Sequence, residues 1–161
     1  MDDESVARGK NIPEKQDLLR RKRLSSKVIA ILATDPDPKI RRGVPFHPSA
    51  PTRILDAMLL DENALVRQTT ALVAKLSESA FDKAIRTQTS MIRSLIARNP
   101  QLPRKFLPVI AGDANSEVAD DAVAILKTLS GHELIGAIAE APFNDGKRRA
   151  RALERLARKA T

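Results

Sequence analysis

The sequence predicts an all-α fold built from repeated helical units, and three observations support this prediction. First, the segment HPSAPTRIL at 47–55 matches NPQLPRKFL at 99–107, an offset of 52 residues. Second, half that offset, 26 residues, separates four apolar positions in succession: Ile40, Val66, Ile92 and Val118. Third, no segment sustains the alternation and the β-branched and aromatic enrichment typical of strands. A period of this length indicates one unit that is copied along the chain, each copy burying its apolar face against its neighbours.

The composition agrees with packed helices. The apolar residues are mainly Ala, Leu, Ile and Val, and the aromatic residues are four Phe, with no Tyr and no Trp. Small alanine faces let helices approach closely. With 161 residues, the chain is one ordinary domain that buries roughly two thirds of its unfolded surface.

The first elements follow from turn residues and prolines. Residues 1–13 lack apolar periodicity, which predicts a disordered N-terminal tail. Pro13 starts a first helix, and Ser25 or Ser26 caps the next one, which runs through Ala33. Asp35 and Asp37 each precede a proline that suits the first position of a helix, so a short helix follows them.

The repeats then continue along the chain. One unit has a helix from Pro51, a tight turn at 61–63 and a longer helix that reaches Leu76. The unit at 78–98 lacks the proline signature, and Thr87 stands where the other copies have aspartate. In the copy that follows, Pro108 removes a backbone hydrogen bond and predicts a kink or a short helix.

The final segment departs from the 26-residue phase. Residues 132–140 predict one more helix, residues 142–146 a turn, and residues 146–161 a basic helix that caps the array. We expect its apolar side to dock on the preceding helix through Leu153 and Leu156. The domain prediction is therefore a tail at 1–13, a repeat domain at 14–145 and a capping helix at 146–161.

The segments LATDPDPKIRR, HPSAPTRILDAMLLDENALVR and ARNPQLPRKFLPVIAGDANSEV resemble the leucine-rich repeat variant family, within the broader HEAT-like α-solenoids. The resemblance covers residues 24–130. It implies a short right-handed α-solenoid, a superhelix of about four to five two-helix repeats. The founding member of that family is associated with a cysteine-ligated iron–sulfur cluster, and this chain has no cysteine, so that cofactor is not expected.

Two aspartates are followed six residues later by an arginine: Asp35 by Arg41 and Asp61 by Arg67. These arginines could read phosphates. The spacing also resembles the aspartate–arginine ladder of HEAT-like repeats, which braces the turns between repeats, and we favour this structural interpretation. In the third copy Ala119 replaces the arginine that would follow Asp113.

The excess positive charge, +8 for the whole chain, lies at the two ends. Residues 1–27 carry +3, residues 28–145 carry −1 and residues 146–161 carry +6. Candidate phosphate-binding or anion-binding residues are the cations of these ends: Lys147, Arg148, Arg149, Arg151, Arg155, Arg158, Lys159, Arg20, Arg21, Lys22 and Arg23. The C-terminal helix is equally well explained as a solvated cap.

The sequence favours no catalytic, cofactor or metal site. Without cysteine, thiol nucleophiles and zinc ribbons are excluded, and His47 and His132 lack acidic neighbours at ligand spacing. No phosphate-binding loop or G-x-S-x-G motif occurs. No apolar run reaches the ~18–20 residues of a membrane span, and the polar N-terminus does not resemble a secretory signal, so we expect a cytoplasmic protein.

The leading functional prediction is a non-enzymatic, monomeric scaffold that binds a protein partner in a groove. The alternative is a nucleic-acid-associated protein that grips the phosphate backbone through its basic N-terminal and C-terminal helices. The scarcity of aromatic residues disfavours base stacking, although contacts to a duplex backbone do not need it.

Overall fold

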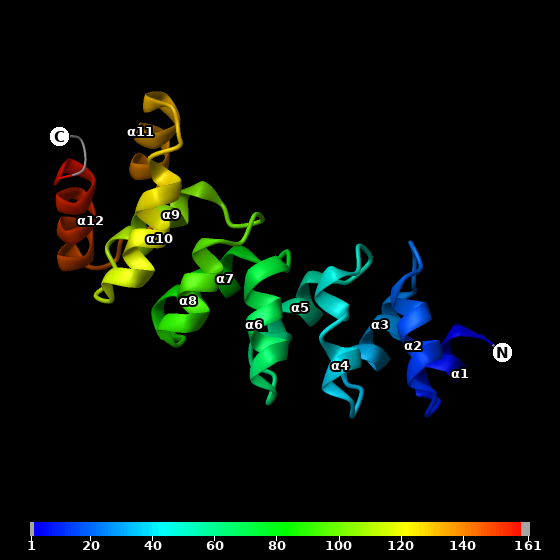
Figure 1. Cartoon of the computed structure of the whole chain (residues 1–161). Helices are drawn as coiled ribbons and strands as arrows, with labels where there is room; N and C mark the ends of the chain where they lie inside the picture. Colours follow the sequence, from blue (N-terminus) through cyan, green and yellow to red (C-terminus); the bar gives the residue numbers. More distant parts are fainter. Residues whose placement is uncertain (1, 159–161) are drawn as a thin grey trace. The chain divides into compact units, whose positions relative to one another are not determined.

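The computed structural model describes residues 2–158, and all regular structure within this range is helical: twelve α-helices and two short 3₁₀ helices, with no strand. The prediction of an all-α fold is confirmed. The chain divides into two compact units, Met1–Ser77 and Glu78–Thr161, which are described separately below (Figure 1).

The helices of the first unit are short and follow one another closely. In chain order they are α1 (Asp3–Arg8), α2 (Ile12–Leu19), α3 (Ser26–Ala33), α4 (Pro38–Arg41), the 3₁₀ helix η1 (Val44–Phe46), α5 (Thr52–Met58) and α6 (Ala64–Val73). Pro45 lies within η1 and, as predicted, the second helix of this repeat is very short.

The second unit begins with a helix pair and ends with the basic helix. Its elements are α7 (Glu78–Thr87), α8 (Ser90–Ala97), the 3₁₀ helix η2 (Arg104–Phe106), α9 (Leu107–Ala111), α10 (Ser116–Leu126), α11 (Gly131–Ala139) and α12 (Gly146–Arg158). Pro108 stands in the first turn of α9, where its missing N–H costs nothing, and the helix is short as expected.

One feature of the repeat is the residue that caps its second helix. Helices α2, α4, α6, α8 and α10 begin 26 residues apart, and the residue before each accepts a backbone N–H bond through its side-chain oxygen. These N-caps are Asn11, Asp37, Asn63, Thr89 and Asn115. Such a cap stabilises a helix by about 1 kcal/mol. The unit at 78–98 therefore keeps the phase of the repeat although it lacks the prolines.

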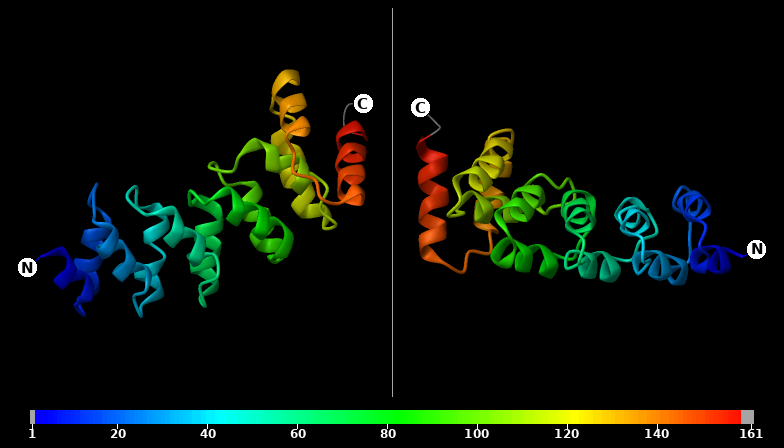
Figure 2. Two further views of the ribbon diagram at one scale, coloured as in Figure 1. Left: turned by 180° about the vertical axis from the view of Figure 1, so that it is seen from behind. Right: turned by 60° about the horizontal axis from the view of Figure 1, so that its bottom comes forward.

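In the first unit the helices alternate between two rows. Contacts join α1 to α3 and α3 to α5, whereas α2 contacts α4 and α4 contacts α6; both rows can be followed in Figures 1 and 2. The core lies between the rows and includes Leu18, Ile29, Leu32 and Val66, all fully buried. Ile40 and Val66, which lie three positions after the N-caps Asp37 and Asn63, are thus core positions.

In the second unit α10 is central. It packs on α8 and α9, and α9 in turn contacts η2, α11 and α12. Ile110, Val123 and Leu126 are fully buried there, and Phe81 packs on Phe106 with ring centroids 6.4 Å apart. These contacts place α12 directly over the C-terminal end of α9.

The N-terminal residues differ from the sequence prediction. Residues 3–8 form α1 instead of a disordered tail, with Asp2 as N-cap, and Ala7 is buried against α3. The polar composition did not reveal this helix because Ala7 is its one buried residue. Gly9 and Asn11 then separate α1 from α2.

Candidate functional site

A ladder of ion pairs runs between successive repeats, each pair joining residues 20 positions apart. In the first unit Lys15 Nζ lies 2.5 Å from Asp35 Oδ2, and Arg41 Nε lies 2.8 Å from Asp61 Oδ2. In the second unit Arg93 Nε lies 2.8 Å from Asp113 Oδ2. We call these three pairs the ladder.

The partners in the ladder differ from the six-residue spacing noted in the sequence. Arg41 donates to the carbonyl oxygen of Asp35 at 2.8 Å, whereas its carboxylate partner is Asp61 of the next repeat. Arg67 likewise donates to the carbonyl oxygen of Asp61 at 2.6 Å. Each aspartate carboxylate also accepts the backbone N–H two residues ahead, for instance Asn63 N–H to Asp61. The carboxylate partner of Arg41 thus differs from the one that the six-residue spacing suggested, and the bracing role stays a prediction.

The ladder charges stabilise one another. Hydrogen bonding to Asp61 raises the pKa of Arg41, although burial opposes this, and the hydrogen bond from Arg41 lowers the pKa of Asp61. Burial alone would raise the pKa of Asp113, but the hydrogen bonds from Arg93 and from the N–H of Asn115 lower it overall. These groups are therefore charged and paired at neutral pH, which suits a structural role.

Three of the predicted anion-binding arginines lie on the inner side of α12 and bond to the end of α9. Arg148 Nη2 lies 3.1 Å from Asp113 Oδ2, and Arg151 Nε donates to the carbonyl oxygen of Gly112 at 2.9 Å. Arg155 Nη1 donates to the carbonyl oxygens of Ala111 and Asp113. These carbonyls belong to a helix C-terminus, whose last groups lack helical partners. The arginines of α12 thus cap α9.

A glycine permits this close contact. A Cβ at position 112 would lie 2.1 Å from the carbonyl oxygen of Arg148 and 2.7 Å from its Cγ. The apolar docking predicted for α12 is wrong in detail, because Leu153 is 41% exposed whereas Ala152 is fully buried. The reason is that the arginines, with their longer reach, occupy the face that meets α9.

The other predicted cations of α12 do not join this cluster. Lys147 and Arg149 are exposed, and Arg158 pairs with Glu154 on its own helix. Lys159 lies outside the described residues. The predicted basic helix is therefore divided into a side that caps α9 and a side that faces solvent.

The N-terminal cations are exposed and lie at the end of α2 and in the loop after it. Arg20 pairs with Asp17 at 2.6 Å and Arg21 with Asp3 at 2.5 Å. Lys22 and Arg23 are exposed without a partner among the described residues. Exposed pairs of this kind contribute little stability.

His47 has a structural role in the turn before α5. Its Nε2 lies 2.8 Å from the carbonyl oxygen of Arg21, and its Nδ1 accepts the N–H of Ser49 at 3.1 Å. Asn99, which matches it at an offset of 52, accepts the N–H of Gln101 in the same way. Among residues 2–158 no group of three or more His, Cys, Asp or Glu side chains is placed to hold a metal ion.

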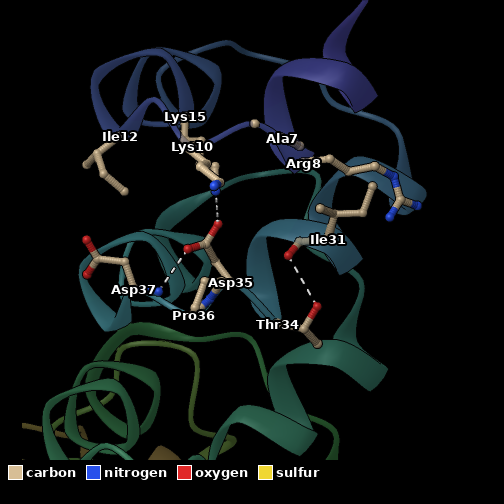
Figure 3. A pocket seen from close by; sticks show the side chains of 11 residues that line it. Ala7, Arg8, Lys10, Ile12, Lys15, Ile31, Thr34, Asp35, Pro36 and Asp37 are labelled. Carbon is tan, nitrogen blue, oxygen red and sulfur yellow. Dashed lines mark hydrogen bonds and ion pairs between the residues drawn. The ribbon is translucent and has the colours of Figure 1, made fainter.

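Two grooves lie on the first unit and are related by the repeat. The first groove, about 520 Å³, lies among α1, α2, α3 and the start of α4 (Figure 3). Ile12 and Ile31 supply apolar surface, the Lys15–Asp35 pair forms its centre, and Arg8 and Lys10 add positive charge.

The second groove, about 450 Å³, lies between α3 and α5. Its apolar lining is Ala30, Ala33, Ile54, Ala57 and Met58, and Thr34, Arg53 and Asp61 complete it. A shift of 26 residues carries four lining positions of the first groove onto the second: Ala7, Arg8, Ile31 and Asp35 become Ala33, Thr34, Ala57 and Asp61. The two grooves of the first unit are therefore lined at corresponding positions of successive repeats.

Sequence reasoning missed several residues of these features. The N-caps recur at 26-residue intervals as Asn, Asp or Thr, and Lys15 precedes and Arg93 follows the predicted ladder arginines Arg41 and Arg67 at the same interval. Both series are visible in the sequence once the helix starts are known. The grooves have no comparable signal, because they depend on how far apart the helices pack.

No helix within the described range is long and apolar enough to cross a membrane. Comparisons of the chain with protein-family models, with curated proteins and with solved structures find no match.

Proposed function

We propose that this chain is a non-enzymatic α-helical repeat scaffold whose first unit binds an extended, acidic segment of a partner protein. The architecture that we infer is a short right-handed α-solenoid of the leucine-rich repeat variant or HEAT-like kind. The alternating rows of the first unit and the helix starts at 26-residue intervals support this inference.

The single observation that carries the proposal is the repeated groove of the first unit. Successive helices of a row pack with their axes about 8–10 Å apart. An extended peptide advances about 3.3 Å per residue. A segment that fills both grooves would therefore place one aliphatic side chain in each groove, and these two side chains would be three residues apart in the sequence of the segment.

The charges at the grooves favour an acidic segment. Asp35 and Asp61 are neutralised within the ladder, and Asp37 caps the N–H of Lys39. Arg8, Lys10 and Arg53 are exposed and have no ion-pair partner among the described residues. The net field at the grooves is positive, which attracts acidic residues and opposes basic ones.

A catalytic role has no support from the buried charged groups. Lys15, Arg41 and Asp113 are held in ion pairs, and both ring nitrogens of His47 are engaged by the main chain. Among residues 2–158 no buried side-chain nitrogen or oxygen lacks a hydrogen-bond partner. The nucleic-acid alternative is weakened in turn, since three arginines of α12 bond to the protein itself.

The proposal is tested with a fluorescent peptide of the pattern Asp-Leu-Asp-Asp-Leu-Asp, titrated with the full chain at about 50 mM salt, where surface charges are weakly screened. We expect saturable binding that falls at least about fivefold in Ala57→Arg, because an arginine there obstructs the second groove. Ala64→Arg, at the exposed start of α6, is the matched control and retains binding.

A second peptide, Lys-Leu-Lys-Lys-Leu-Lys, checks the sign of the charge and is expected not to bind. Absence of saturable binding by the acidic peptide, or equal affinities of Ala57→Arg and Ala64→Arg, would refute the proposal.

A further inference from the structure

A hollow in the second unit is lined mainly by charged groups. It has a volume of about 360 Å³ and lies among α7, α8, the α9–α10 turn and the start of α12. We call it the arginine pocket; its lining is Arg86, Arg93, Asp113, Ala114, Asn144, Asp145, Arg148 and Arg151. Four arginines thus face two aspartates.

Two of the four guanidinium groups are already engaged by the protein. Arg93 binds both carboxylate oxygens of Asp113, at 2.8 and 2.9 Å, and donates to the carbonyl oxygen of Gln88. Arg86 binds Asp82, Asn144 and the carbonyl oxygen of Pro142. These side chains form the wall of the arginine pocket.

The other two arginines have donors to spare. Arg148 makes one bond, from Nη2 to Asp113, and Arg151 makes one bond, from Nε to the carbonyl oxygen of Gly112. Their remaining N–H groups have no partner among the described residues. Since no buried side-chain nitrogen is unpaired there, these donors reach the solvent.

The electrostatics of the arginine pocket favour a bound anion. Burial lowers the pKa of Arg148, the charge of Asp113 raises it, and the positive charges of Arg86, Arg93 and Arg151 lower it further. The carboxylate of Asp113 is already paired with Arg93 on both oxygens. Bringing a further negative charge between the arginines would relieve their repulsion.

We propose that the arginine pocket binds a phosphate group through the free donors of Arg148 and Arg151. A guanidinium presents its N–H groups as a planar fork that binds two oxygens at once. A carboxylate has two oxygens and serves one fork, whereas the terminal oxygens of a phosphate serve two forks. The phosphate is that of a free phosphomonoester or of a phosphorylated side chain, and this site is independent of the grooves of the first unit.

The first test titrates the wild-type chain with inorganic phosphate at about 50 mM salt and follows the arginine Nε–H signals by NMR. We expect a saturable shift of Arg148 and Arg151 with a dissociation constant of about 1 mM or tighter. Because it uses the wild-type protein, this measurement does not depend on a variant folding. The absence of a saturable shift up to about 10 mM phosphate overturns the proposal.

A pair of variants tests which arginine matters. Arg151→Gln is expected to weaken phosphate binding about tenfold, as measured by calorimetry, because it removes one fork. Arg149→Gln, an exposed position on the same helix, is expected to leave it unchanged. Equal affinities of the two variants overturn the proposal, and circular dichroism checks that α12 remains folded in both.

The source of the phosphate is distinguished with end-blocked Ala-Ala-phosphoserine-Ala-Ala and its unphosphorylated form. Binding of the phosphopeptide about tenfold tighter than inorganic phosphate identifies a phosphorylated side chain as the ligand. Equal affinities identify the free phosphate group. Binding of the unphosphorylated peptide as tightly as its phosphorylated form overturns the proposal.

Discussion

Arg155 donates a hydrogen bond of 2.6 Å to the carbonyl oxygen of Asp113, and Arg41 makes the same kind of bond, at 2.8 Å, to Asp35. Arg41 lies six residues after its aspartate on the same repeat, whereas position 119, six residues after Asp113, is alanine. The missing arginine of the last repeat is thus supplied by α12. Arg155 of the basic terminal helix therefore has the role that Arg41 has in the first unit.

Loss of Arg155 is therefore expected to destabilise the second unit. Arg155→Ala leaves two carbonyl oxygens, of Ala111 and Asp113, without a charged donor, and such bonds contribute about 1.5–3 kcal/mol each to stability. We expect a loss of about that size for the substitution, measured by urea unfolding. Arg149→Ala, on the exposed side of α12, is the control and changes stability by less than about 0.5 kcal/mol. Equal effects of the two would contradict the capping role.

The free energy of unfolding should fall strongly when one partner of a ladder pair is removed. Arg41→Ala leaves Asp61 without its charged partner where both side chains are less than 10% exposed. We expect the free energy of unfolding of the first unit to fall by about 3–5 kcal/mol. The neighbouring Arg42 is exposed, and Arg42→Ala should cost less than about 0.5 kcal/mol. Similar losses for both variants in urea unfolding would show that Arg41 is not a structural residue.

The ladder also predicts how stability depends on pH. The pKa of Asp61 lies below its ordinary value of 3.8 because of the bond from Arg41, so folding favours the charged form. The stabilisation is complete well above pH 3.8 and disappears as the pH falls through the lowered value. Asp61→Asn should be less stable at pH 7 and lose less stability on acidification than the wild type.

Glu117→Gln, at an exposed carboxylate in the first turn of α10, is the matched control for the acid titration. It should keep the acid sensitivity of the wild type when unfolding is followed by circular dichroism from pH 7 to about pH 2. An acid profile of Asp61→Asn identical to that of the wild type would contradict this explanation.

Two glycines should respond in opposite directions to alanine. At Gly112 a Cβ would collide with the backbone of Arg148, so Gly112→Ala should displace α12 and cost at least about 1–3 kcal/mol. Gly136 lies within α11, and a Cβ added there would meet no atom within 4 Å beyond its chain neighbours and the local helix backbone. Gly136→Ala should stabilise by about 0.5–1 kcal/mol. Thermal unfolding of both variants checks the pair, and a stable Gly112→Ala would rule out the close docking of α12.

We expect nucleic-acid binding to be weak, because only two cations in the first turn of α12, Lys147 and Arg149, are exposed and available to phosphates. Each phosphate that a cation neutralises adds about −0.9 to the log–log salt slope on duplex DNA. We therefore expect the double variant of Lys147→Ala and Arg149→Ala to change this slope by no more than about 1.8. Micromolar binding at about 150 mM salt with a much steeper slope would support the backbone-gripping alternative. Point substitutions are preferable to a truncation after residue 145, because the truncation would also remove the arginines that cap α9.

The repeat could be predicted because its signals are local in sequence. Val66, Ile92 and Val118 recur at a fixed interval, and each is buried. The N-cap series is also present in the sequence. It is harder to recognise because Thr89 stands where the other copies have asparagine or aspartate. The helix at 3–8 was missed because Ala7 is its one buried residue, which leaves no apolar stripe to detect.

The sequence by itself determined the helical class, the 26-residue period, the place of the turns and the concentration of positive charge at the two ends, because all of these depend on residue types at short separations. The tertiary structure decided which charges meet. Arg41 pairs with Asp61 rather than with the carboxylate of Asp35. Arg148, Arg151 and Arg155 bond to the end of α9 rather than facing solvent. Long cationic side chains can reach several partners, and the packing of the helices selects among them, as the packing of α12 on Gly112 does for the arginines of α12.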